Sequence, residues 1–126
     1  MKLTVRGFMS VTITSRIVSD VVILDVAGKF DIGEDSLRQS VKTFLAEGRQ
    51  HFLLNLVDVP YIGSWGITQI ISAWTAIRSG RGIIGLVAPA KAARDVLQFT
   101  KLDTALAIYS NEAEALQHFA ESSRLC

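Results

Sequence analysis

The stretch that decides the fold runs from His51 to Ile71 and reads HFLLNLVDVPYIGSWGITQII. Its first residues are almost continuously apolar, which predicts a buried strand. A loop containing Pro60 and Gly63 follows, and the apolar residues after it recur at the spacing of an amphipathic helix. This order places Ser64 at the amino end of that helix. A serine at such a position can cap the free backbone N–H groups, or it can carry a phosphate that the helix dipole tolerates.

The remaining sequence extends this pattern in both directions. Strands are predicted over Val11–Arg16, Val21–Ala27, Phe52–Leu56, Ile83–Val87 and Leu106–Tyr109. Helices are predicted from Glu34 to a stop at Gly48, from Ser64 with Ile67, Ile70, Ile71, Trp74 and Ile77 on the buried face, over Ala90–Phe99, and from a cap at Ser110 or Asn111. The first two strands form a hairpin around Ser19-Asp20. The order β-β-α-β-α-β-α-β-α indicates an α/β fold, with a mostly parallel sheet and about four helices packed against it.

Length and composition indicate one domain over residues 1–126. The chain has 49% hydrophobic residues and a formal net charge of +1, without a basic run, so we expect no direct binding of nucleic acid. No apolar stretch reaches signal-peptide or membrane-span length, which predicts a cytoplasmic protein without membrane insertion. Residues 1–8 are expected to form a flexible extension. The single cysteine, Cys126, offers neither an internal disulfide nor a metal site.

Two motifs resemble those of enzymes, but the elements or residues around them do not match a catalytic or cofactor site. Gly80–Gly85 matches G-x-G-x-x-G, but it leaves a predicted helix and enters a strand, whereas a dinucleotide site requires the reverse order. Ser64 lacks the preceding glycine of a hydrolase elbow, because Ile62 stands there. His51 and His118 are the only histidines and lie far apart in the sequence. The sequence therefore predicts no enzyme, no cofactor and no metal ion.

Three further side chains carry expectations. Asp25 interrupts an apolar strand, so its carboxylate is expected to be ion-paired or hydrogen-bonded. Trp74 continues the buried helical stripe. Trp65 falls outside that stripe beside Ser64, where an exposed aromatic ring would suit a partner anchor.

Four segments resemble conserved segments of one protein family. Leu54–Ile67, which reads LNLVDVPYIGSWGI, is similar to the signature L-D-L-S-x-V-x-F-I-D-S-S-G-L of STAS domains, the anti-sigma factor antagonist family. Gly28–Asp31 resembles the family's G-x-L-D, and Phe99–Asp103 resembles its link into the last strand. Ser110–Leu116 resembles its S-x-x-E-A-L helix start. The resemblance covers nearly the whole chain and implies a STAS-like fold.

The resemblance also implies a regulatory switch. In this family the unmodified protein binds an anti-sigma factor that is also a serine kinase and so frees a sigma factor, and phosphorylation of one serine breaks that complex. Ser64 matches the acceptor serine. The partner-binding surface implied for this chain consists of Asp31, Gly63, Ser64, Trp65, Gly66 and Gln69. Two positions depart from the motif, since Gly63 replaces its aspartate and Trp65 its second hydroxyl residue.

A second hypothesis keeps the fold and changes the role. The chain would then be a structural adaptor without a phosphorylation cycle, in a signalling scaffold or as a subunit of a lipid transport complex, with Trp65 as a permanent anchor. In either role we expect a monomer or a weak dimer, because the edge strand from Val11 to Arg16 can pair with another chain or be blunted by its polar face.

Overall fold

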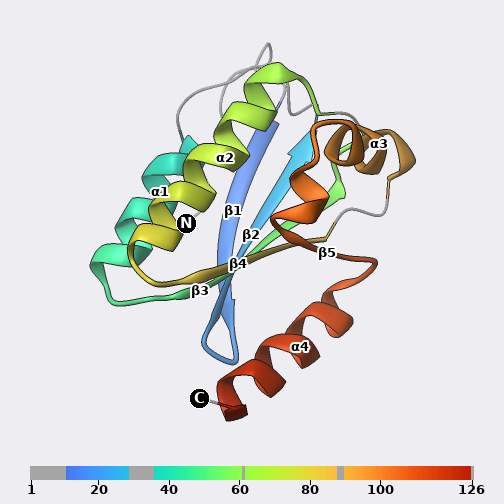
Figure 1. Cartoon of the computed structure of the whole chain (residues 1–126). Coiled ribbons are helices and arrows are strands. Elements are labelled where there is room, and N and C mark those ends of the chain that lie inside the picture. The colour runs from blue at the N-terminus through green and yellow to red at the C-terminus, as the bar shows by residue number, and fades with distance from the viewer. Residues whose placement is uncertain (1–10, 29–35, 61, 88–89, 126) are drawn as a thin grey trace.

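The computed structural model describes residues 11–28, 36–60, 62–87 and 90–125. The elements within these ranges, shown in Figure 1, are β1 (Val11–Val18), β2 (Val21–Gly28), α1 (Ser36–Ala46), β3 (His51–Asp58), α2 (Ser64–Ser79), β4 (Ile83–Val87), α3 (Lys91–Phe99), the 3-10 helix η1 (Leu102–Thr104), β5 (Ala107–Tyr109) and α4 (Glu112–Leu125). The predicted order of strands and α-helices is confirmed, and η1 is an addition to it. The expected extension at residues 1–8 and the predicted site residue Asp31 lie outside the described ranges.

The five strands form one sheet in the order β1-β2-β3-β4-β5. β1 pairs with β2 in the antiparallel direction, and the other neighbours are parallel. The turn between β1 and β2 consists of Ser19 and Asp20, which have φ angles of 49° and 69°. Positive φ at both central residues is typical of the type I′ turn, whose twist matches that of the two strands. The predicted hairpin is therefore confirmed.

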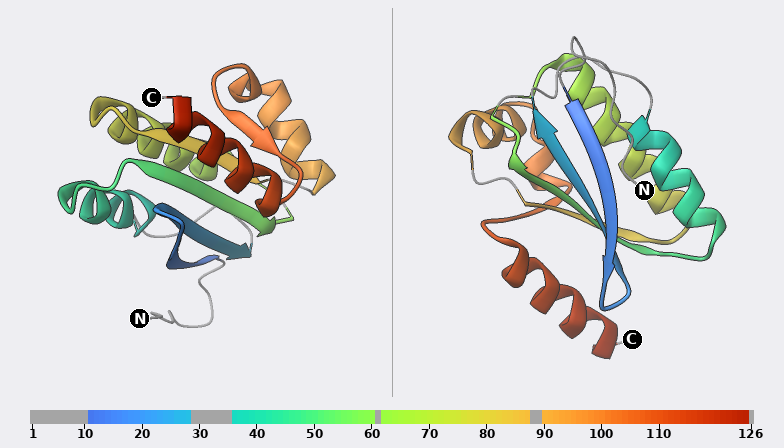
Figure 2. Two further views of the ribbon diagram at one scale, coloured as in Figure 1. Left: turned by 90° about the horizontal axis from the view of Figure 1, so that it is seen from below. Right: turned by 180° about the vertical axis from the view of Figure 1, so that it is seen from behind.

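The two faces of the sheet are covered unequally. One face carries the main core, which α1, α2 and α3 close with side chains such as Leu37, Ile70 and Leu97. The other face carries a smaller core under α4, made of Val21, Ile23, Leu53, Val87, Tyr109, Ala115 and Phe119. Figure 2 shows α1 and α2 side by side and α4 set apart from them. Because successive strand residues point to opposite faces, the nearly continuous apolar runs of β2 and β3 supply both cores.

The ends of the helices follow the predicted signals in most places. Gly48 has a φ of 89° just after α1, as a helix-terminating glycine requires. Asn111 caps α4, because its Oδ1 accepts a hydrogen bond of 2.8 Å from the backbone N–H of Glu114. Of the two predicted cap residues, Ser110 and Asn111, the structure shows Asn111 as the cap. α3 begins at Lys91, one residue later than predicted, and ends at Phe99.

The predicted buried face of α2 is partly wrong. The buried residues are Gly66, Gln69, Ile70, Ala73 and Ile77, whereas Ile71 is 41% exposed. Two small residues on the inner face, Gly66 and Ala73, permit a close approach to the main core, and the larger Trp65, Ile67 and Trp74 pack at its margin. The helix is therefore rotated about its axis away from the orientation that the isoleucines alone predict.

Candidate functional site at the amino end of α2

Ser64 is the first residue of α2. The chain leaves β3 at Asp58, and Gly63 takes the N-cap position with an extended backbone, φ −92° and ψ −177°. The Gly63 carbonyl accepts the first helical hydrogen bond, from the N–H of Ile67 at 3.0 Å. Since Gly63 holds the cap position, Ser64 lies one residue too far along the helix for the usual side-chain cap.

Within the described ranges, the Ser64 hydroxyl makes no hydrogen bond that holds the fold together. The side chain is exposed, and no hydrogen bond from its hydroxyl is found within the described ranges. The Ser64 backbone carbonyl accepts a bond of 3.1 Å from the Thr68 hydroxyl. The alternative of Ser64 as a helix cap is therefore not met, and the hydroxyl is available to a reaction partner.

The amino end of α2 is electrostatically suited to an anion. Its first N–H groups have no intrahelical acceptors, and the helix dipole adds a partial positive charge there. No acidic residue stands in the first turn to offset this charge, and Gly63 occupies the position where the family motif has its aspartate. A phosphate on Ser64 would therefore meet a favourable local potential.

Burial separates the predicted contact residues into two groups. Ser64 is exposed, but Gly63, Gly66 and Gln69 are buried. Gln69, which belongs to the predicted partner-binding surface, is only 7% exposed, and its Oε1 has no hydrogen-bond partner among the described residues. Trp65 is half-buried and packs against the main core, so only part of its ring is exposed beside Ser64. The partner-binding role of these residues stays a prediction.

An uncharged surface missed in the sequence analysis continues from Ser64 along the helix. Ser64, Thr68, Ile71 and Thr75 are all exposed and follow each other at helical spacing, and we call them the outer α2 stripe. Thr75 donates to the Ile71 carbonyl at 2.9 Å, so its hydroxyl, like that of Thr68, is satisfied within the helix. The only charged residue in the sixteen of α2 is Arg78, near its carboxyl end. The near absence of charged residues between Ser64 and Ser79 is the sequence feature that could have predicted this surface.

A polar network ties β1 and β2 to α4 on the opposite face of the sheet. Arg16 forms two hydrogen bonds with the Asp25 carboxylate, at 2.7 and 3.0 Å, and also bonds Glu112. Asn55 donates to Asp25 at 2.7 Å. The Arg16 bonds hold the pKa of Asp25 below its usual value, against the effect of partial burial. The prediction that Asp25 is paired is confirmed.

The two histidines have separate partners beneath α4. The His51 ring stacks on Phe119 with centroids 6.1 Å apart, and His118 Nδ1 shares a hydrogen bond of 2.5 Å with the Tyr109 hydroxyl. Burial, with a smaller contribution from the Glu114 charge, raises the pKa of Tyr109. Neither histidine is joined to Ser64 by a contact in the described ranges.

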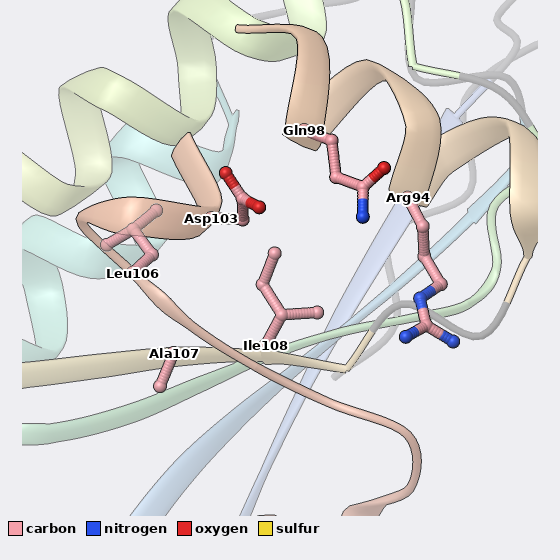
Figure 3. A pocket seen from close by; sticks show the side chains of 6 residues that line it. All are labelled: Arg94, Gln98, Asp103, Leu106, Ala107 and Ile108. Atoms are coloured by element: carbon pink, nitrogen blue, oxygen red, sulfur yellow. The ribbon is translucent and has the colours of Figure 1, made fainter. Parts of the chain in front are cut away.

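A small open pocket of about 230 Å³ lies between α3 and β5. Figure 3 shows its lining: Arg94, Gln98, Asp103, Leu106, Ala107 and Ile108. None of these belongs to the outer α2 stripe. Among the described residues no group of three or more histidine, cysteine or acidic side chains is placed to hold a metal ion, and no helix is long and apolar enough to cross a membrane.

The fold and the β3–α2 junction define a recognised class. The profile of the STAS domain matches residues 12–115, and the chain belongs to this family. It is 34% identical over 104 residues, 81% of this chain and 92% of the relative, to a Thermotoga neapolitana protein named as an anti-sigma factor antagonist and homologue of TM1081.

Solved structures share the architecture. The crystal structure of an anti-sigma factor antagonist from Mycobacterium paratuberculosis superposes with a TM-score of 0.77 at 24% identity, over 86% of this chain and 93% of that one. The Bacillus cell fate determinant SpoIIAA in its phosphorylated form superposes with a TM-score of 0.68 at 19% identity, over 86% of this chain and 99% of that one. At these identities the likeness establishes the fold.

Proposed function

We propose that this protein is an anti-sigma factor antagonist that binds an anti-sigma factor with serine kinase activity and is released when Ser64 is phosphorylated. The observation that carries the proposal is the Ser64 hydroxyl, which is exposed, makes no hydrogen bond within the described part of the chain, and stands at the amino end of a helix without acids in its first turn. The Thermotoga neapolitana relative is named for this role, and SpoIIAA has been solved in a phosphorylated form.

The proposed docking surface is the outer α2 stripe together with the amino end of the helix. Its exposed residues carry no charge, so a partner can cover them without removing water from an ion. Ile71, at 41% exposure, is the apolar group that gains most from such a contact. The hydroxyls of Thr68 and Thr75 are already satisfied within the helix, so covering them leaves no donor unpaired.

Phosphorylation would act differently on the free and the bound protein. The phosphate adds about −1.5 to −2 charges at pH 7. In the free protein it remains hydrated and gains about 0.3–1 kcal/mol from the helix dipole. In the complex the same group must lose water at a close contact. The difference between the two states is what drives release.

The acceptor is tested by mass. The protein is incubated with ATP and lysate of its own host, and the intact mass is compared for wild type, Ser64→Ala and Ser79→Ala, which alters an exposed serine at the other end of α2. We expect one added phosphate on wild type and Ser79→Ala and none on Ser64→Ala. Equal incorporation in all three proteins would overturn Ser64 as the acceptor.

The docking surface is tested separately by calorimetric titration against the anti-sigma factor encoded by the same host. Ser64→Glu is expected to weaken binding at least tenfold, which corresponds to about 1.4 kcal/mol. Ile71→Ala is expected to weaken it about tenfold, whereas Ile83→Ala, which alters an isoleucine of similar exposure on β4, leaves it unchanged. Equal effects of the two isoleucine substitutions would contradict docking through α2.

The adaptor role remains the second candidate, and one observation favours it. Gly63 replaces the aspartate of the family motif, which removes a carboxylate from the acceptor's neighbourhood. Stable co-purification with scaffold or transporter subunits, together with no phosphate on Ser64, would establish this role instead. In both cases the proposed protein is a single non-catalytic domain over residues 1–126 that works in the cytoplasm.

A further inference from the structure

The two edges of the sheet differ in how they are protected. The outer edge of β5 offers only three residues, and very short edge strands are a common defence against pairing with another chain. β1 offers eight residues, VTITSRIV, and its register with β2 is continuous from end to end. Within the described part of the chain, β1 pairs with β2 alone.

β1 lacks most of the usual edge defences. It contains no proline, glycine or lysine, and its pairing with β2 shows no bulge. Its single charge, on Arg16, is already paired with Asp25 and Glu112. Six of its eight residues are β-branched valine, isoleucine or threonine, and one of them, Ile17, is 45% exposed. The type I′ turn holds this edge in a fixed conformation.

We propose that β1 is a self-association surface, on which a second copy of this chain pairs β1 with β1 in the antiparallel direction across a two-fold axis. An antiparallel pair of identical strands satisfies the two-fold symmetry of a closed dimer, because the same patch serves both copies. The two sheets then form one continuous sheet. The surface uses no residue of the outer α2 stripe and does not rest on the proposed function.

The sequence of β1 favours one register. In an antiparallel pair, residues opposite each other point to the same face of the sheet. The two-fold axis must therefore lie at one residue near the middle of β1, which faces its own copy, and not between two residues. An axis at Arg16 would bring two like charges together, which is unfavourable. An axis at Ser15 places Ile13 opposite Ile17 twice, and Thr14 opposite Arg16 twice. This register covers the exposed Ile17 with the larger Ile13, whereas an axis at Thr14 would set it opposite Val11, so we assign the axis to Ser15.

The first experiment measures association of the full chain. Sedimentation equilibrium from micromolar to millimolar protein is expected to show a monomer–dimer equilibrium. Ser15→Lys places a charge on the axis and is expected to weaken dimerisation at least tenfold, whereas Ser79→Lys, on another exposed serine, leaves it unchanged. Circular dichroism checks that both variants fold. A monomer at every concentration, as would result if residues 1–10 of the same chain cover β1, overturns the proposal, as do equal effects of the two lysines.

The second experiment tests the register. Opposing residues in an antiparallel pair have Cα atoms about 4.5 or 5.5 Å apart, and a disulfide accepts either distance. With Cys126→Ser as background, Ser15→Cys is expected to give a covalent dimer on mild oxidation, and Ser79→Cys is not. A dimer that Ser15→Cys fails to cross-link would overturn the assigned axis.

Discussion

Replacing Gln69 by methionine should stabilise the protein. The side chain is 7% exposed on the inner face of α2, and its Oε1 finds no hydrogen-bond partner in the part of the chain that the structure describes. A buried polar atom without a partner costs about 1–3 kcal/mol, because it has lost its bond to water and gained none in return. Methionine has a similar length, no branch, and a helix propensity close to that of glutamine.

The expected gain follows from these terms. Gln69→Met removes the unsatisfied oxygen without leaving a cavity, so the free energy of unfolding should rise by about 1–3 kcal/mol. For a chain of this size each kcal/mol corresponds to about 4 °C in Tm. The matched control is Gln117→Met, which alters an exposed glutamine of α4 and should change the free energy by less than about 0.5 kcal/mol.

Urea denaturation followed by tryptophan fluorescence measures both variants, because Trp65 and Trp74 lie on the same helix as Gln69. The predicted gain is refuted if Gln69→Met lowers the urea midpoint by the equivalent of 1 kcal/mol or more while the dependence of the free energy on urea stays unchanged. Such a loss would mean that the amide is hydrogen-bonded in solution, for example to a trapped water molecule.

Three further outcomes are expected. Asn111→Ala removes the cap bond to the Glu114 N–H and should cost about 1 kcal/mol in urea denaturation, and a loss below 0.3 kcal/mol would contradict the capping role. Gly85→Ala places a Cβ 2.9 Å from Tyr109 Cε2 and 3.3 Å from Phe119 Cζ, so the Tyr109 ring must move and Phe119 of α4 must give way slightly. We expect a loss of about 1–3 kcal/mol with faster amide exchange in α4, and an unchanged stability would contradict this. The folded-state pKa of Asp25 is lowered, so its contribution is present above the ordinary aspartate pKa of about 3.9 and is lost as pH falls through the folded value. The acid-induced loss of stability should therefore be smaller in Asp25→Asn, and identical pH profiles would contradict it.

Most of the fold could be predicted because its signals are local. The apolar runs of β2 and β3, the alternation of β1 and the glycine after α1 each depend on neighbours in the sequence. The helix dipole and the exposure of Ser64 follow from a strand–loop–helix order that is visible in one stretch of about twenty residues. The parallel sheet then follows from the order of the elements.

The parts that could not be predicted depend on neighbours distant in the sequence. The isoleucines of α2 suggest an inner face that includes Ile71, but packing selects the face with Gly66 and Ala73, and Gln69 is buried as a result. The sequence predicts that Asp25 has a polar partner but does not show which one, because Arg16 and Asn55 reach it from two other strands. Trp65 packs against the main core, and the sequence around Trp65 does not show where that core lies.

The order of the strands in the sheet is the order in which they are synthesised. Each new strand joins the free edge left by the previous one, and none has to enter between two strands already paired. A chain emerging from the ribosome therefore presents its strands in the order in which they pair. α4 comes last and closes the smaller core. A nascent chain that has released β4 already holds both strands that flank β3, whereas α3, β5 and the covering of the second face by α4 wait for the rest of the chain.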